Sequence, residues 1–128
     1  MKASMYQSAV PPCVRALTNL AAILEKAAAH AEARKIDPAA LLNARLYPDM
    51  LPFTKQIQIG TDTASGGAAR LTGKEPPVIE HNETTFAALV ARIHQTIQYL
   101  NSIKPEQLDG TEDKTVSWQS RSSTKVPR

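Results

Sequence analysis

Apolar residues recur every three or four positions along three long segments of the chain, residues 4–35, 48–73 and 84–104. Such spacing places apolar side chains on one face of an α-helix. The three stripes are Val10, Val14, Leu17, Ala21, Leu24, Ala28 and Ala31; Met50, Phe53, Ile57, Thr61, Ala64, Ala68 and Leu71; and Phe86, Val90, Ile93, Ile97 and Leu100. The pattern predicts three amphipathic helices that pack together through these faces.

Proline residues and a capping aspartate refine the helices predicted for the first part of the chain. Asp37 stands before Pro38, a carboxylate cap followed by proline at the first helical position, and this predicts a short helix over residues 38–45. Proline lacks a backbone donor. The first long helix therefore either has a short turn that ends before Pro11 or is kinked at Pro11 and Pro12.

The second long helix is predicted to open at Pro48 and to stop near Gly73. Gly60, Gly66 and Gly67 lie within it, each costing roughly 1 kcal/mol against alanine. Small side chains at these positions are expected to let a neighbouring helix approach closely.

Asn82 or Thr84 is expected to cap the third long helix, with Glu83 in its first turn, and the helix should stop before Pro105. The stretch that follows is rich in turn residues. Its TVSW segment, residues 115–118, has the composition of one short strand.

Composition agrees with an all-α domain of one core. The chain has 19 alanines and only six aromatic residues in 128, and alanine is the best helix former. It has no run of 18 or more apolar residues, so no membrane span is expected. The single cysteine, Cys13, favours a reducing, cytoplasmic setting.

The charge is unevenly distributed. Up to Asp113 the chain carries 11 basic and 12 acidic residues, net −1, whereas Lys114, Arg121, Lys125 and Arg128 give the end +4. The end is poor in apolar residues, which favours a solvated, disordered tail over residues 117–128. The body, residues 1–116, has no basic stripe with interleaved aromatic residues, so no nucleic-acid partner is expected.

Three stretches carry a resemblance to a known family: MYQSAVPPCVRALTNLAAILEKAAAHA, LLNARLYPDMLPFTKQIQIGTDTA, and NETTFAALVARIHQTIQYLNSI with the later LDGTEDKTV. Over residues 4–116 the chain resembles a family of uncharacterised proteins in the DinB/YfiT-like superfamily, and ARLYPDMLPFTKQ is the most specific part. The resemblance implies an all-α, up-and-down four-helix bundle. Many relatives in the superfamily are taken to be metal-dependent enzymes, but this branch offers no established activity to transfer.

The family pattern implies a short strand pair and a fourth long helix after LDGTEDKTV, and the sequence departs from it after Val116. One hypothesis is a chain cut short, for instance by a reading-frame change after Ser117. Three long amphipathic helices have apolar faces wider than they can bury against one another. We therefore expect a second copy of the chain to cover the remainder, in a helical homodimer with two-fold symmetry.

The metal site of the superfamily, where present, uses three histidines. His30, His81 and His94 are the histidines of this chain, and no two are three or four residues apart. A zinc site needs three or four convergent ligands, so we expect no metal and no other cofactor. Cys13 is expected to be a small buried apolar residue rather than a reactive thiolate.

Four residues are candidates for a small-ligand site. Asp49 and Gln56 are seven residues apart and would share one face of the second helix, while Tyr6 could approach from the first helix. Arg45 could join them and pair with Asp49. In the resembling family these positions look like a polar cluster at one end of the bundle. The alternative is that Asp49 only stabilises the helix start.

These observations predict a cytoplasmic helical-bundle protein that self-associates, with no assigned reaction. Two alternatives stay open at the level of the sequence. One is a metal- or thiol-dependent enzyme of the DinB type, which rests on analogy of fold alone. The other is a module that binds a small ligand at the Tyr6, Asp49 and Gln56 end.

Overall fold

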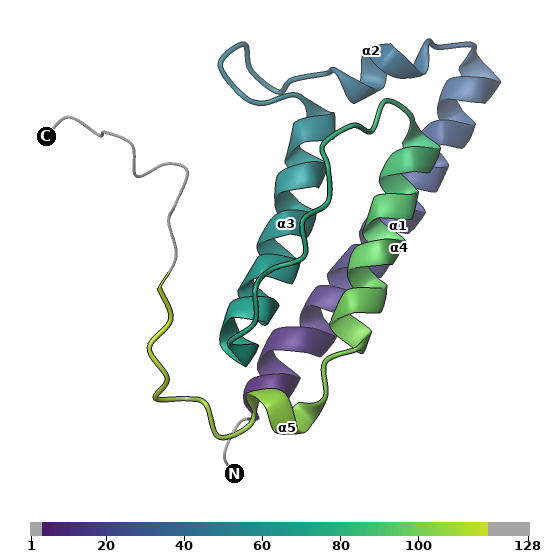
Figure 1. The fold of residues 1–128 in the computed structure, drawn as a ribbon. Helices are drawn as coiled ribbons and strands as arrows, with labels where there is room; N and C mark the ends of the chain where they lie inside the picture. The colour runs from purple at the N-terminus through teal and green to yellow at the C-terminus, as the bar shows by residue number, and fades with distance from the viewer. Residues whose placement is uncertain (1–3, 118–128) are drawn as a thin grey trace, which may run out of the picture.

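The structure is a computed structural model that describes residues 4–117, and α-helices are the only regular secondary structure in this part of the chain. The helices are α1 (Met5–Arg34), α2 (Pro38–Leu42), α3 (Phe53–Thr72), α4 (Phe86–Asn101) and α5 (Pro105–Leu108) (Figure 1). The predicted all-α bundle of three long helices and a short one is confirmed, with α5 as an extra single turn. Of the predicted tail, residues 118–128 lie outside the described residues.

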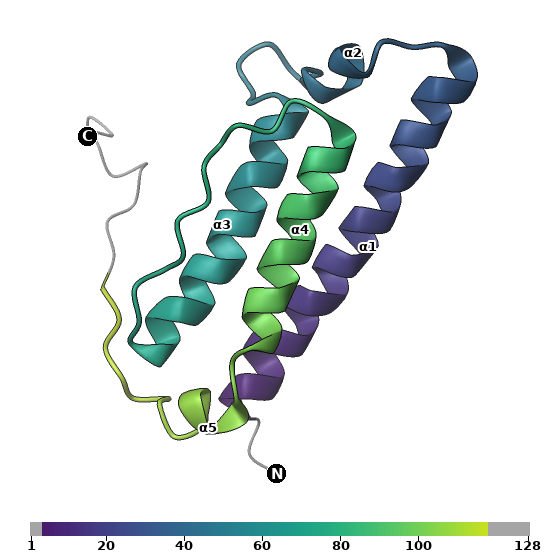
Figure 2. The same ribbon diagram turned by 45° about the vertical axis from the view of Figure 1, so that its right-hand side comes forward.

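The three long helices lie side by side, with α2 spanning one end of the bundle and α5 packed near the start of α1 at the other end (Figures 1 and 2). α1 runs antiparallel to α3 and α4. α3 and α4 run in the same direction, because the linker between them, residues 73–85, returns along the length of α3 (Figure 2). α1 and α3 therefore alternate in direction, as in an up-and-down bundle. α3 and α4 do not, because the linker carries the chain back to the end of the bundle where α3 begins.

α1 is one continuous helix of 30 residues. The Ser4 hydroxyl caps it by accepting a hydrogen bond from the backbone N–H of Gln7, and Lys35 ends it in the left-handed conformation. The helix passes through Pro11 and Pro12. Of the two predicted alternatives, a first turn that ends before Pro11 is thus excluded.

α3 begins at Phe53, five residues later than predicted from Pro48. The residue before a proline disfavours the helical conformation, so Leu51 cannot continue a helix into Pro52. Pro52 becomes the N-cap, and residues 43–51 form an exposed loop. The C-terminal stop is as predicted, with Gly73 in the left-handed conformation at φ 80°.

α4 is capped by Thr85, whose hydroxyl accepts from the N–H of Ala88, and not by Asn82 or Thr84. Thr85 still has an extended backbone, so it takes the N-cap position directly before Phe86, the first residue of α4. α4 ends before Pro105, as predicted. The described part of the TVSW segment, residues 115–117, contains no strand, and Trp118 lies outside the described residues.

The core lies mainly where α1 and α4 face each other. The largest fully buried apolar side chains of the described residues are Leu24, Leu89, Ile93, Leu100, Leu108 and Val10. α4 packs against both α1 and α3, whereas α1 and α3 meet over only a few residues. Within the described part of the chain, no helix combines the length and the apolar character that a membrane crossing requires.

The expected close approach of a helix to the glycines of α3 is not found within the described chain. A Cβ atom built on Gly60 or Gly67 would meet nothing within 4 Å, and one on Gly66 would meet only the side chain of Arg70. Gly60 and Gly67 therefore face open space.

Candidate functional site

The structure brings together two of the four predicted ligand-site residues. Arg45 and Gln56 both line a groove of about 610 Å³ between α1, α2 and α3. Asp49 is exposed in the loop before α3, so it shares no helix face with Gln56. Tyr6 lies in the first turn of α1, where its N–H donates to Asp109 at the opposite end of the bundle. Because α1 is antiparallel to α3, the starts of the two helices cannot meet.

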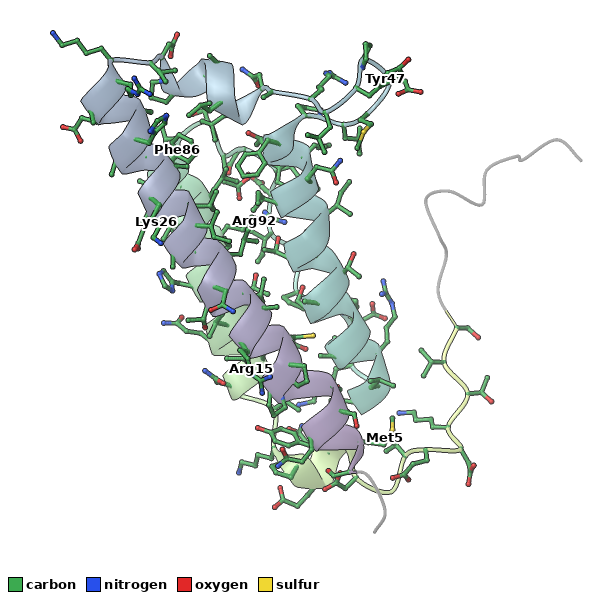
Figure 3. All side chains as sticks on the ribbon, turned by 180° about the vertical axis from the view of Figure 1, so that it is seen from behind. Met5, Arg15, Lys26, Tyr47, Phe86 and Arg92 are labelled. Atoms are coloured by element: carbon green, nitrogen blue, oxygen red, sulfur yellow. The ribbon has the colours of Figure 1, made fainter. Side chains whose placement is uncertain are left out.

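This groove, called here the α2 groove, is walled mostly by apolar residues, among them Ala27, Leu41, Met50, Phe53 and Phe86. In Figure 3 Phe86 is labelled near the α2 end of the bundle, where α1 passes in front of α4. Such a lining suits an apolar ligand body with few polar groups.

The polar groups of the α2 groove are partly engaged. Arg45 Nη1 donates to the carbonyl oxygen of Met50 at 2.6 Å, and Gln56 Nε2 donates weakly to that of Leu51 at 3.4 Å. No ion pair joins Arg45 to Asp49 among residues 4–117. The predicted binding role of these residues stays a prediction.

The histidines do not form a metal site. Among the described residues, no group of three or more His, Cys, Asp or Glu side chains is placed to hold a metal ion. His30 and His94 are exposed, and His81 is hydrogen-bonded to Asp62.

A second group of polar residues surrounds Arg92, near the middle of α4. Arg92 is only 2% exposed, although it carries a permanent charge. Its guanidinium forms ion pairs with Asp62 on α3 and, at 2.9 Å, with Glu83 in the linker. Figure 3 shows Arg92 in the space between the helices.

The remaining donors of Arg92 also find acceptors. Nε donates to the Thr61 hydroxyl at 2.7 Å, and Nη1 donates to the Glu80 carbonyl oxygen at 3.0 Å. The side chain thus connects α4 to α3 and to the linker backbone. Within residues 4–117, no buried side-chain nitrogen or oxygen lacks a hydrogen-bond partner.

His81 extends the cluster on the linker side. Its Nε2 lies 2.6 Å from Asp62 Oδ2, and its Nδ1 lies 3.2 Å from Lys55 Nζ. Lysine can only donate, so this geometry assigns Nδ1 as the acceptor and Nε2–H as the donor to Asp62. Both ring nitrogens of His81 are then hydrogen-bonded within the protein.

Burial and hydrogen bonding act in opposite directions on Glu83. Burial raises the pKa of Glu83, but hydrogen bonds from Arg92 and Gln58, together with the positive charge of Arg92, hold that pKa below its ordinary value near 4.5. The carboxylate is therefore stabilised in its ionised form. Every group in the cluster has a partner within the protein, so we interpret its role as structural: it holds the linker against α3 and α4.

Sequence analysis missed this cluster, although a signal was present. Arg92 stands three residues after Leu89 and four before Thr96, on the buried face of α4. A charged residue at such a position needs a buried partner of opposite charge. The sequence alone does not show that the partners would be Asp62 and Glu83.

Residues 5–127 match the family described as "Domain of unknown function (DUF1993)". The chain belongs to this family. None of the curated proteins matches the chain. The family assignment agrees with the resemblance inferred from the sequence, but the match extends to residue 127, beyond Val116, where the sequence was expected to depart from the family pattern. The family description names no reaction.

A crystal structure of a DinB family member protein from Shewanella denitrificans resembles this DUF1993 chain, with 40% sequence identity and a TM-score of 0.77. The match covers 80% of this chain and 59% of that one, so the chain spans less than two thirds of its relative. The likeness confirms the DinB-like helical fold. The activity of the longer relative does not transfer with it.

Substitution Arg92→Met should lower the free energy of unfolding by about 3 kcal/mol, because the buried Glu83 and the partly exposed Asp62 would be left without their counter-charge. Arg92→Lys should give a smaller loss, since it keeps the charge but not the fork of donors. Urea denaturation measures both. The control is Arg15→Met on the exposed side of α1, and a loss no larger at Arg92 than at Arg15 would contradict the assigned role.

The lowered pKa of Glu83 predicts a loss of stability in acid. The contribution of Glu83 is present above the ordinary carboxyl pKa and is lost as the pH falls through the lower folded value. Urea midpoints of the native chain and Glu83→Gln should therefore converge as the pH is lowered below about 4.5.

The exposed Glu112→Gln provides the control for this comparison. The Ser4 hydroxyl holds the pKa of Asp109 below its ordinary value in the native chain and in both variants, so that effect cancels. A difference between native chain and Glu83→Gln that stays constant with pH would show that Glu83 is not stabilised as a carboxylate.

Proposed function

We propose that this DUF1993 protein is a cytoplasmic helical bundle that self-associates through the open face between α1 and α3. The observation that carries the proposal is apolar surface on both helices beside the α2 groove. This surface, called here the α1–α3 face, consists of Leu20, Ile23 and Ala27 on α1 and Phe53, Gly60, Ala64, Gly67 and Leu71 on α3.

Helical spacing places these residues on the same side. Ala27, Phe53 and Gln56 line the α2 groove, and the other members follow from Ala27 or Gln56 in successive steps of three or four residues, about one turn each. Ile23 is 57% exposed, and Gly60 and Gly67 meet no neighbouring atoms. A large apolar side chain beside open glycines on a facing helix is a surface suited to a packed helix.

A second copy of the chain is the occupant that we favour. Identical faces related by a two-fold axis would let Ile23 of each copy lie against small residues of the other, and isologous contact is the commonest arrangement of homo-oligomers. The cytoplasmic part of the proposal is supported by Cys13, which is half-buried on α1 and has no cysteine partner in the chain.

A second candidate function is the binding of a small apolar ligand in the α2 groove. Its volume of about 610 Å³ lies in the range typical of ligand pockets, and Arg45 and Gln56 offer polar groups at its edge. Association of two copies over the α1–α3 face would close the groove on one side. The two functions are therefore compatible.

Self-association is tested by light scattering over a range of protein concentrations. The native chain should have the mass of two chains, and Ile23→Lys should shift it toward one, because a lysine would be desolvated in the contact. The matched control is Ala22→Lys, on the next residue but on the outer side of α1. A native mass of one chain at every concentration, or equal effects of the two variants, would contradict the proposal.

Ligand binding is tested with the fluorescent dye anilinonaphthalene sulfonate, which has an apolar body and an anionic group. Ala44→Glu places a negative charge in the α2 groove and should reduce the fluorescence enhancement several-fold, by repulsion and by added polarity. Ala33→Glu, exposed on α1 outside the groove, should leave it unchanged. Equal enhancement in all three proteins would count against a ligand site there.

A further inference from the structure

A second cavity lies on the opposite flank of α3, between that helix and the linker. Its volume is about 350 Å³. Pro76, Pro77, Val78 and Ile79 of the linker form one wall, and it shares no lining residue with the α2 groove. The cavity, called here the linker pocket, is therefore independent of the proposed self-association.

α3 contributes Asp62, Gly66 and Arg70 to the linker pocket, at intervals of four residues on one side of the helix. The guanidinium of Arg70 folds back over Gly66, and a Cβ atom at Gly66 would lie only 3.0 Å from Arg70 Nη1. Glycine at position 66 thus provides the room for the guanidinium at the floor of the pocket.

Arg70 differs from Arg92 in one decisive respect. Arg92 is surrounded by acceptors, whereas the guanidinium of Arg70 makes no hydrogen bond or ion pair with another residue between 4 and 117, although its backbone carbonyl accepts from the N–H of Gly73. A guanidinium presents donors in a planar fork that fits a carboxylate at two points. Arg70 therefore offers an unused anion-binding group at a half-buried position.

Among the residues that line the linker pocket, Arg70 is the cation whose guanidinium has no acidic partner between residues 4 and 117, and Lys55 lies beside the pocket against His81. Asp62 is paired with Arg92 and His81, and Glu83 is paired with Arg92. The carboxylates of Asp62 and Glu83 therefore already have partners within the protein. The charged residues Lys74, Glu75 and Glu80 on the linker have exposed side chains that do not line the pocket.

We propose that the linker pocket binds a small organic monocarboxylate with a compact apolar body. Arg70 takes the carboxylate by a two-point contact, and Pro76, Pro77 and Ile79 cover the apolar body. Asp62 also lines the pocket, but its carboxylate is paired with Arg92, and the apolar linker wall favours a carboxylate that carries an apolar group over an inorganic anion. This inference concerns a site that is separate from the α1–α3 face and from the α2 groove.

The test is a calorimetric titration of the full chain with sodium benzoate at constant ionic strength. Benzoate should bind, and Arg70→Gln should weaken binding by about tenfold or more, as expected for the loss of charge-assisted hydrogen bonds. Acetate lacks the apolar body, benzamide lacks the charge, and sulfate is an inorganic anion. All three should bind more weakly than benzoate.

The sharpest comparison uses neighbouring glycines. Gly66→Ala places a methyl group 3.0 Å from Arg70 Nη1 and should weaken benzoate binding by less than Arg70→Gln, because the guanidinium must move aside, whereas Gly67→Ala meets nothing within 4 Å and should leave affinity unchanged. Both replacements make the same change in helix propensity, and thermal unfolding checks that each variant is folded.

Three results would overturn the proposal. The first is no benzoate binding to the native chain up to about 10 mM, beyond the weak limit of a useful site for a ligand of this size. The second is equal affinity of Gly66→Ala and Gly67→Ala. The third is sulfate binding as tight as benzoate binding, which would show a simple anion contact without a pocket for the apolar body.

Discussion

The path of the linker and the register of α3 against α4 depend on the buried guanidinium of Arg92. A buried charge costs several kcal/mol unless it is paired and hydrogen-bonded. Here the cost is offset only when Asp62, Glu83 and the linker carbonyls are all in place at once. Apolar stripes could slide past one another by one helical turn with a modest loss of packing. A guanidinium with directed donors cannot, and we infer that Arg92 selects one register.

The two flanks of α3 acquire different character from this arrangement. The linker covers one flank, because Arg92 and the Asp62–His81 contact hold it there. On the opposite flank, Phe53 lines the α2 groove, and Gly60 and Gly67 have open space beside them. Self-association is proposed on the open flank and carboxylate binding on the covered one, so both proposals follow from the placement of one extended segment.

Much of the fold was predictable from local rules. The stripes of α1 and α4 identified both helices, and Asp37 and Gly73 marked boundaries that the structure confirms, because capping depends only on neighbouring backbone groups. Local rules failed where two signals competed. Pro48 resembles a helix start, but Pro52 follows it closely and excludes Leu51 from a helix.

The candidate sites were harder to predict, because they depend on helix direction and on contacts distant in sequence. Tyr6 was grouped with Arg45, Asp49 and Gln56 as though all stood at one end of the bundle, yet antiparallel packing places Tyr6 at the other end. Arg92 meets Asp62 across 30 residues, and no periodicity encodes that pairing. Its position on the buried face of α4 was the one available indication.

The central claim is that Arg92 is desolvated and fully hydrogen-bonded in the native protein. Proton–nitrogen NMR of the arginine side chains tests it most directly, with Arg92→Lys to assign the signals. The account predicts one guanidinium whose Nε and Nη protons exchange slowly with water at neutral pH and disappear in that variant. Arginine side-chain protons that all exchange at the rate of exposed groups would contradict it.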